Sequence, residues 1–131
     1  MERLLASPAA LVDSIPPPLS KLGSTLLPVA RAAARFIVVK HHTGSMTQAE
    51  AQAVVAGVME TADARLAHHP HLVGDAFTFA DLAFAAALGM VKPHPRQPLK
   101  ENARVAWTEP ELAAAFPRVI AWRDETMEKY R

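Results

Sequence analysis

Cysteine is absent from the 131-residue sequence, and this absence excludes several classes of chemistry. A thiol nucleophile, a thiolate zinc site, an iron–sulfur cluster and a disulfide scaffold all require cysteine. The net charge is also small. A formal net charge of +1 gives no strong field that would attract nucleic acid or an anionic membrane. The longest uncharged apolar run, residues 82–91, is far shorter than the roughly 20 residues that cross a bilayer. We therefore expect a cytoplasmic protein that binds neither nucleic acid nor membrane.

Aromatic residues make up only 6% of the sequence and alanine is abundant, a composition that favours helices over strands. Residues 36–39 are β-branched enough to resemble a buried strand, but no partner strand with turn residues lies near them, so we assign them to the end of a helix. The length leaves room for one domain, residues 1–131, with residues 1–18 as a candidate for a loosely attached N-terminal segment. The expected fold is an all-α bundle of about five helices.

Helix-start and helix-stop signals divide the first third of the chain. An N-cap serine followed by proline at residues 7–8 opens a short helix, and the three prolines at residues 16–18 end it. Apolar residues at spacings of three and four then predict a long helix over residues 19–40. Pro28 removes one backbone hydrogen bond, so it predicts a kink or a fresh helix start near Leu27.

A capping box at residues 47–50 begins a second long helix, and the histidines and proline at residues 68–70 close it. The residues predicted to form its buried stripe are Ala51, Val54, Val55, Val58, Ala62 and Leu66. Gly57 costs about 1 kcal/mol relative to alanine inside a helix, so we expect a neighbouring helix to approach closely there.

Residues 92–107 contain three prolines and four basic residues, which predicts an exposed connection. A further capping box at residues 108–111 starts a short helix, and Pro117 starts the last one. We expect the last helix to bury Phe116, Val119, Ile120, Met127 and Tyr130, to hold Trp122 at its flank, and to turn Arg118, Arg123, Asp124, Glu125, Glu128 and Lys129 toward solvent.

The most informative segment is HLVGDAFTFADL, residues 71–82. Thr78 is a predicted N-cap, Asp81 completes a capping box with it, and Phe77 is placed to pack on Leu82. Residues 82–90 are apolar on every side, which predicts a helix at the centre of a bundle.

Two blocks of the sequence, HLVGDAFTFADLAFAAAL and FPRVIAWRDETMEKY, together resemble the C-terminal all-helical domain of glutathione S-transferases. The first block matches the family pattern that leads into the central helix, and the second matches the pattern that opens a later helix. The matching positions are Leu72, Val73, Gly74, Asp75, Thr78, Ala80 and Asp81, then Phe116, Pro117, Val119 and Trp122. The resemblance is specific from about Thr47 onward and only compatible before His42.

The resemblance implies structural roles for matched residues and no catalytic one. The capping box of Thr78 and Asp81 would be the family's folding box. Gly74 would form the turn, and Trp122 would belong to the later motif. Family proteins also carry a thioredoxin-like domain that binds glutathione and activates its thiol, and we find no strand–helix alternation of that kind before Thr47. The resemblance therefore implies glutathione as co-substrate, no cofactor within this chain, a thioredoxin-like partner domain and a homodimer.

Other chemistry has little support in the sequence. Six histidines are present, but the cluster at residues 68–71 has neighbouring side chains that point apart and no HExxH-type pair, so we expect no metal site. Residues 41–42 are better explained as a helix C-cap. No G-x-S-x-G elbow and no glycine-rich phosphate loop is present.

In the enzymes that this chain resembles, the hydrophobic substrate lies against the first long helix and the last helix of the domain. The corresponding candidates for a substrate pocket are Arg31, Arg35, Phe36 and Met90, with the arginines placed to attract the carboxylates of a glutathione conjugate. The alternative is that Phe36 and Met90 are core residues and that the arginines form a solvated or dimer-facing edge.

Two functions remain open on the sequence alone. The chain is the helical half of a detoxifying glutathione transferase, which conjugates glutathione to small hydrophobic electrophiles when a thioredoxin-like domain supplies the activated thiol. Alternatively it is a binding or scaffold module that mediates association between proteins without catalysis.

Overall fold

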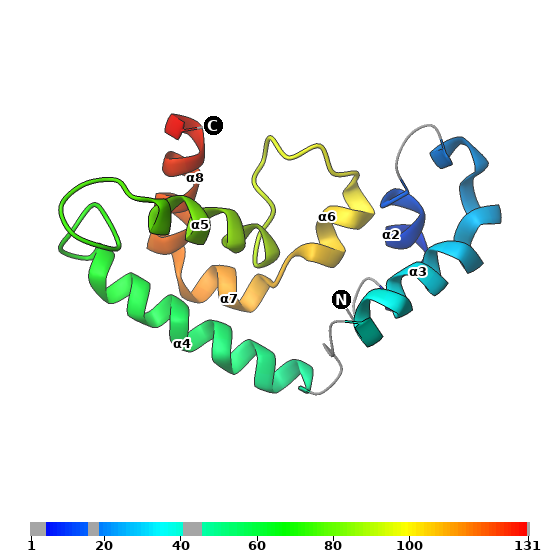
Figure 1. Ribbon diagram of the computed structural model, residues 1–131, viewed down its shortest axis with the longest axis horizontal. Coiled ribbons are helices and arrows are strands. Elements are labelled where there is room, and N and C mark those ends of the chain that lie inside the picture. The colour runs from blue at the N-terminus through cyan, green and yellow to red at the C-terminus, as the bar shows by residue number, and fades with distance from the viewer. Residues whose placement is uncertain (1–4, 16–18, 41–45, 131) are drawn as a thin grey trace. The chain divides into compact units, whose positions relative to one another are not determined.

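The computed structural model describes residues 5–15, 19–40 and 46–130, and these residues form helices and loops without a strand (Figure 1). The predicted all-α class is confirmed, and residues 36–39 are helical as expected. The elements are α2 (Pro8–Asp13), the 3₁₀ segment η1 (Leu19–Leu26), α3 (Leu27–Lys40), α4 (Gln48–Leu66), α5 (Phe79–Ala87), the 3₁₀ turn η2 (Leu88–Met90), α6 (Glu101–Trp107), α7 (Pro110–Ala115) and α8 (Pro117–Tyr130).

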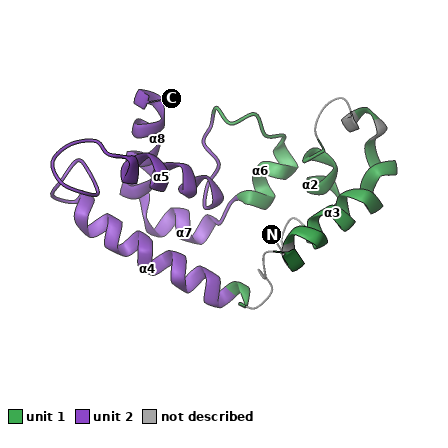
Figure 2. Cartoon of the chain, viewed as in Figure 1, with its two compact units in different colours: residues 1–48, 96–107 green, residues 49–95, 108–131 purple. Residues whose placement is uncertain are grey.

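The chain divides into two compact units, each assembled from two separate stretches of sequence (Figure 2). Unit 1 comprises residues 1–48 and 96–107, and unit 2 comprises residues 49–95 and 108–131. We describe each unit by itself. The single-domain assignment of residues 1–131 stays a prediction.

Unit 1 packs α2 against α3 and α6. Ser7 caps α2, because its Oγ accepts a hydrogen bond of 3.2 Å from the Ala10 amide. Ala10 and Leu11 are buried together with Ala34 of α3. The α6 residues Ala106 and Trp107 pack against the same cluster. The core of unit 1 therefore includes part of the candidate N-terminal segment, whose residues 1–4 and 16–18 lie outside the described residues.

The proline in the first long helix acts as the sequence predicts. A new α-helix, α3, begins at Leu27, and Pro28 occupies its first turn, where the missing N–H has no intrahelical partner to lose. The preceding segment η1 bends at Gly23, whose φ of 53° lies in the left-handed region. The predicted cap at residues 41–42 lies outside the described residues.

Unit 2 builds its core from α4, α8 and the segment that follows α5. The buried residues of this core are Met59, Ala62, Leu88, Val91, Val119 and Ile120. The stripe predicted for α4 is buried only in part: Val54, Val55 and Val58 are 56%, 36% and 51% exposed. No atom lies within 4 Å of a Cβ built on Gly57, so the close approach expected there is not found within the described structure.

The prediction of a central helix covered on every side is wrong for α5 within the described residues. Of the predicted residues 82–90, Ala85 and Leu88 are buried, whereas Leu82 is 37% and Met90 is 64% exposed. The uniform apolar composition of residues 82–90 identifies no single inner face, because hydrophobic periodicity needs a polar face for contrast.

Two predictions downstream are also wrong in detail. Residues 92–107 are not an exposed connection: they contain the helix α6, and Pro93 and His94 are buried. All three prolines precede residue 99, so composition averaged over the whole window conceals the helix-forming sequence ENARVAW behind them. The N-cap of α7 is Glu109 rather than Thr108, with Pro110 at the first helical position.

Candidate functional site

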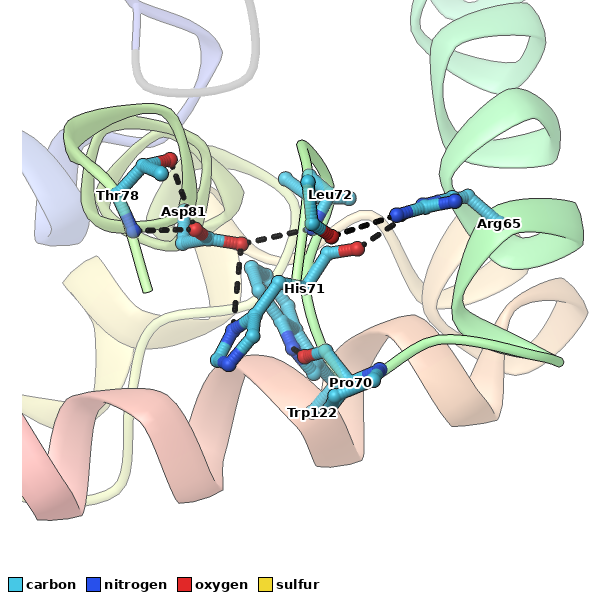
Figure 3. Close-up of polar contacts among 8 residues, drawn as sticks. Arg65, Pro70, His71, Leu72, Thr78, Asp81 and Trp122 are labelled. Atoms are coloured by element: carbon cyan, nitrogen blue, oxygen red, sulfur yellow. Dashed lines mark hydrogen bonds and ion pairs between the residues drawn. The ribbon is translucent and has the colours of Figure 1, made fainter. Parts of the chain in front are cut away.

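The loop between α4 and α5 is organised around the carboxylate of Asp81, which is fully buried (Figure 3). One oxygen, Oδ1, accepts a hydrogen bond of 2.8 Å from the Leu72 amide. The other oxygen, Oδ2, accepts from the Thr78 amide at 2.8 Å and from the Thr78 hydroxyl at 2.9 Å. The predicted capping box between Thr78 and Asp81 is thus formed, and the same carboxylate also holds a loop residue nine positions before it.

The electrostatics of Asp81 favour its charged form. Burial alone would raise the pKa of this carboxyl, but the hydrogen bonds from Leu72 and Thr78, together with the nearby His71, lower the pKa below its ordinary value. The Nδ1 atom of His71 lies 3.9 Å from Oδ1 of Asp81 and has no hydrogen-bond partner among the described residues. A protonated His71 would form an ion pair with this carboxylate.

The lowered pKa of Asp81 predicts a loss of stability in acid. A carboxyl whose pKa is lower in the folded than in the unfolded state stabilises the fold above its unfolded pKa, and this contribution disappears as the pH falls through the folded pKa. We expect the difference in free energy of unfolding between the wild type and Asp81→Asn to be constant near neutral pH and to shrink below about pH 4. Urea titrations at several pH values measure it. A difference that does not change with pH would contradict this assignment.

Side chains from two other helices fix the same loop. Arg65 of α4 donates from Nε to the His71 carbonyl at 3.1 Å and from Nη2 to the Gly74 carbonyl at 2.7 Å. Trp122 of α8 donates from Nε1 to the Pro70 carbonyl at 2.9 Å. Residues 70–81 are therefore tied to α4, α5 and α8 (Figure 3).

The Thr78 side chain contributes one part of this network, so its removal should have a moderate effect. Thr78→Ala deletes the hydroxyl that donates to Asp81 but leaves the backbone amide bond in place. We expect the free energy of unfolding to fall by about 0.5–2 kcal/mol, the range for a lost N-cap. Thr78→Ser keeps the hydroxyl and should stay close to the wild type in the same urea titration. Equal losses in both variants would show that the methyl group matters and not the cap.

Gly74 supplies the turn of this loop through its backbone conformation. Its φ is 64°, and a Cβ built on it would meet no atom within 4 Å, so any penalty for a side chain comes from the backbone alone. We expect Gly74→Ala to lower the free energy of unfolding by about 1–2 kcal/mol. Gly74→Asn should lose less, since asparagine tolerates the left-handed region. Thermal melts of the two variants compare them, and a neutral Gly74→Ala would mean that the turn rearranges.

Phe77 has an aromatic partner that the sequence does not predict, and its predicted packing on Leu82 stays a prediction. Its ring stacks on Tyr130 near the end of α8, with ring centroids 3.7 Å apart and an interplanar angle of 13°. His71 meets the Phe77 ring edge-on at 6.2 Å, and the ammonium group of Lys129 lies 4.9 Å from the Tyr130 ring centroid. The loop is thereby also joined to the carboxyl end of α8.

A second polar cluster, on α8, was missed by sequence reasoning. Arg123 is only 1% exposed, although the sequence predicts an outward side chain. Its Nε donates to Asp124 at 2.7 Å and its Nη1 to the Lys92 carbonyl at 2.6 Å. His94 is also buried, with Nε2 3.9 Å from Asp124 and 3.6 Å from Glu128. The spacing of three from Ile120 to Arg123 places both residues on one face and could have revealed the burial.

The comparisons with known proteins agree with this geometry. The family profile described as "Glutathione S-transferase, C-terminal domain" matches residues 26–129, which is most of the chain. The chain belongs to this family. The match extends over all of the Asp81 loop and reaches α8, so the folding box and the Trp122 contact lie inside the family's domain. No curated protein and no solved structure gives a significant match.

The candidate substrate-pocket residues lie in two different units. Arg31, Arg35 and Phe36 are on α3 of unit 1, and all three are exposed. Met90 ends η2 of unit 2 and is also exposed. The structure thus places Arg31, Arg35 and Phe36 on one helix. A substrate pocket formed by the four candidate residues stays a prediction.

The described residues contain neither a metal-binding cluster nor a membrane-spanning helix. Within these residues, no group of three or more histidine, aspartate or glutamate side chains could hold a metal ion. None of the described helices is long and apolar enough to span a bilayer.

Proposed function

We propose that this chain supplies the helical domain of a cytoplasmic glutathione transferase, which conjugates glutathione to small hydrophobic electrophiles in detoxification. The observation that carries the proposal is the family match over residues 26–129, within which the folding box is complete. The thiol of glutathione needs a positioned donor to lower its pKa. A thioredoxin-like domain would supply this donor, so glutathione is the co-substrate and the helical domain contributes the site for the electrophile.

The α3 helix carries the side chains that this role needs. Arg31 and Arg35 are one helical turn apart and both exposed, so they can attract the carboxylates of glutathione from the same side. Phe36 is exposed beside Arg35 and offers apolar surface to the electrophile.

The test combines the purified chain with the thioredoxin-like domain of a glutathione transferase. We expect the mixture to conjugate glutathione to a chlorinated nitrobenzene faster than either component alone. A double variant, Arg31→Ala with Arg35→Ala, should raise the KM for glutathione about 10-fold or more, because each charge-assisted hydrogen bond is worth about 1.5–3 kcal/mol. Lys21→Ala, which removes an exposed positive charge from η1, is the matched control. A mixture no faster than its parts would overturn the transferase role.

A second candidate function, association with a protein partner, is favoured by a different observation. Val54 and Val58 of α4, and Val29 and Ile37 of α3, are exposed although the apolar pattern of both helices predicts burial. Exposed apolar patches of this kind mark interaction surfaces. The homodimer implied by the family resemblance is the form of association that we propose. Light scattering of the purified chain measures it, and a monomer at every concentration would contradict it.

A further inference from the structure

The charges of the chain are distributed unevenly along the sequence. No acidic residue occurs between Asp13 and Glu50, whereas this stretch contains the basic residues Lys21, Arg31, Arg35 and Lys40. All four basic residues lie in η1 or α3 and are exposed. The net charge of +1 hides this distribution, because acidic residues are in excess in the rest of the sequence. The expectation of no membrane contact rests on the net charge, so it does not describe the local field of this segment.

One side of α3 is apolar and exposed. Val29, Phe36 and Val39 are 63%, 64% and 72% exposed, and Ala32 is exposed between them. Their spacings of three, four and three place all four residues on one side of the helix, which we name the outer face of α3. Ala34 packs into the core of unit 1 from the opposite side of the helix. The core of unit 1 therefore leaves the outer face uncovered.

Basic side chains border the outer face on both sides. At about 3.6 residues per turn, Arg31 and Arg35 lie along one edge and Lys40 lies along the other. The ammonium group of Lys40 lies 5.9 Å from the centre of the Phe36 ring, so this cation is held beside apolar surface. Long basic side chains bury their methylene groups along such a surface and keep the charge in water. Apolar residues flanked by cations are typical of helices that lie in a membrane interface.

We propose that the outer face of α3 binds the surface of a membrane that contains anionic phospholipids. The helix would lie along the surface, with its apolar side chains among the upper parts of the acyl chains and its basic side chains at the phosphate groups. A helix of 14 residues is about 21 Å long, which is shorter than the hydrocarbon core of about 30 Å, so the contact is with the interface. This inference goes beyond the transferase role proposed above.

The uniform charge of α3 favours a lipid surface over a protein partner. Anionic headgroups present negative charge across the whole surface, and a border of basic residues without an acidic one meets no repulsion there. The α4 helix provides a contrast within the same chain. Val54 and Val58 are also more than half exposed. However, α4 contains three acidic residues and one basic one, so an anionic surface would repel it. We therefore expect α3, and not α4, to contact the membrane.

Sedimentation of the purified chain with lipid vesicles tests the proposal. We expect binding to vesicles of phosphatidylcholine and phosphatidylserine in equal parts, little binding to phosphatidylcholine alone, and weaker binding at high salt. Val29→Asp with Val39→Asp should weaken binding by about tenfold or more, because two apolar side chains lose their contact with lipid. Val54→Asp with Val58→Asp is the matched pair on α4 and should bind as the wild type does. Helical circular dichroism checks that both pairs are folded.

Charge reversal tests the contribution of the basic border. Lys21→Glu with Lys40→Glu should weaken binding to the anionic vesicles by about tenfold or more, since each basic residue near such a surface contributes about fivefold. Lys92→Glu, at an exposed position of unit 2, is the control and should change binding little. Equal binding to neutral and anionic vesicles would overturn the proposal, as would equal losses in the Val29–Val39 and Val54–Val58 pairs.

Fluorescent labelling locates the contact, because the natural chain contains no cysteine. An environment-sensitive dye on Val39→Cys should shift its emission to shorter wavelengths on anionic vesicles, whereas the same dye on Val58→Cys should not. Equal shifts at both positions would overturn the proposal. So would a protein complex that Val29→Asp with Val39→Asp disrupts in the absence of any vesicle binding. These valines are not candidate pocket residues, so a failure of lipid binding would leave the transferase role intact.

Discussion

Asp81→Ala is expected to lower the free energy of unfolding by roughly 2–5 kcal/mol, the largest effect of any single change in the loop. The substitution leaves the amides of Leu72 and Thr78 without their acceptor in a partly buried loop. Each unsatisfied buried donor costs about 1–3 kcal/mol. Because domains of this size are marginally stable, the variant should unfold at a much lower urea concentration than the wild type.

Two variants separate the role of Asp81 from a general effect of removing a carboxylate. Asp81→Asn keeps one carbonyl oxygen and loses the second acceptor, so its stability should lie between those of the wild type and Asp81→Ala. Asp75→Ala, at an exposed position of the same loop, should change the free energy of unfolding by less than about 0.5 kcal/mol. If Asp75→Ala and Asp81→Ala were equally destabilised, the buried network would not be the source of the effect.

Arg123→Ala is expected to destabilise unit 2 by roughly 1.5–3 kcal/mol, the range for losing a hydrogen bond that involves a charged group. The guanidinium of Arg123 joins α8 to the backbone of Lys92, and its loss leaves that carbonyl unpaired beside an empty space. Urea unfolding followed by tryptophan fluorescence measures the change, since Trp122 is the neighbouring residue.

The matched variants for Arg123 test charge against packing. Arg123→Met fills most of the volume and also removes Nη2, which has no hydrogen-bond partner among the described residues, so its cost should be less than half that of alanine. Arg118→Ala, on the same helix, breaks a surface ion pair of 3.3 Å with the Asp63 carboxylate and a surface hydrogen bond of 3.1 Å to the Asp63 carbonyl, and it should cost less than about 1 kcal/mol. Similar losses in Arg118→Ala and Arg123→Ala would contradict a special role for the buried side chain.

The helix boundaries could be predicted where a local device marks them. Ser7, Pro28, Thr78 and Pro117 each act within one turn of their own position, and each begins a helix as the sequence indicates. The helix α6 has no such device in the sequence, and the prolines before it suggested a loop instead. Local signals therefore locate helices well only when a cap or a proline stands at the boundary.

The partners of the helices were harder to predict than the helices themselves. The Thr78–Asp81 contact is predictable from the sequence because the two residues are only three positions apart. The hydrogen bond from Arg123 to Lys92 spans 31 residues, and the one from Trp122 to Pro70 spans 52. Nothing in local periodicity encodes such separations. The charge of Arg123 predicts a side chain in solvent, although its position on α8 coincides with the apolar face.

The discontinuous make-up of the two units has a consequence for the order in which they can form. The α2 helix packs against α6, and the hydrogen bond from Asn102 to Asp13 joins residues 89 positions apart. During synthesis the apolar side of α2 stays exposed until the ribosome has added Trp107. By then α4 and α5 have already been synthesised. Closing so long a loop is slow, so unit 1 should be the last to gain protection from hydrogen exchange. A fragment that stops before α6 would leave Leu11 exposed to aggregation.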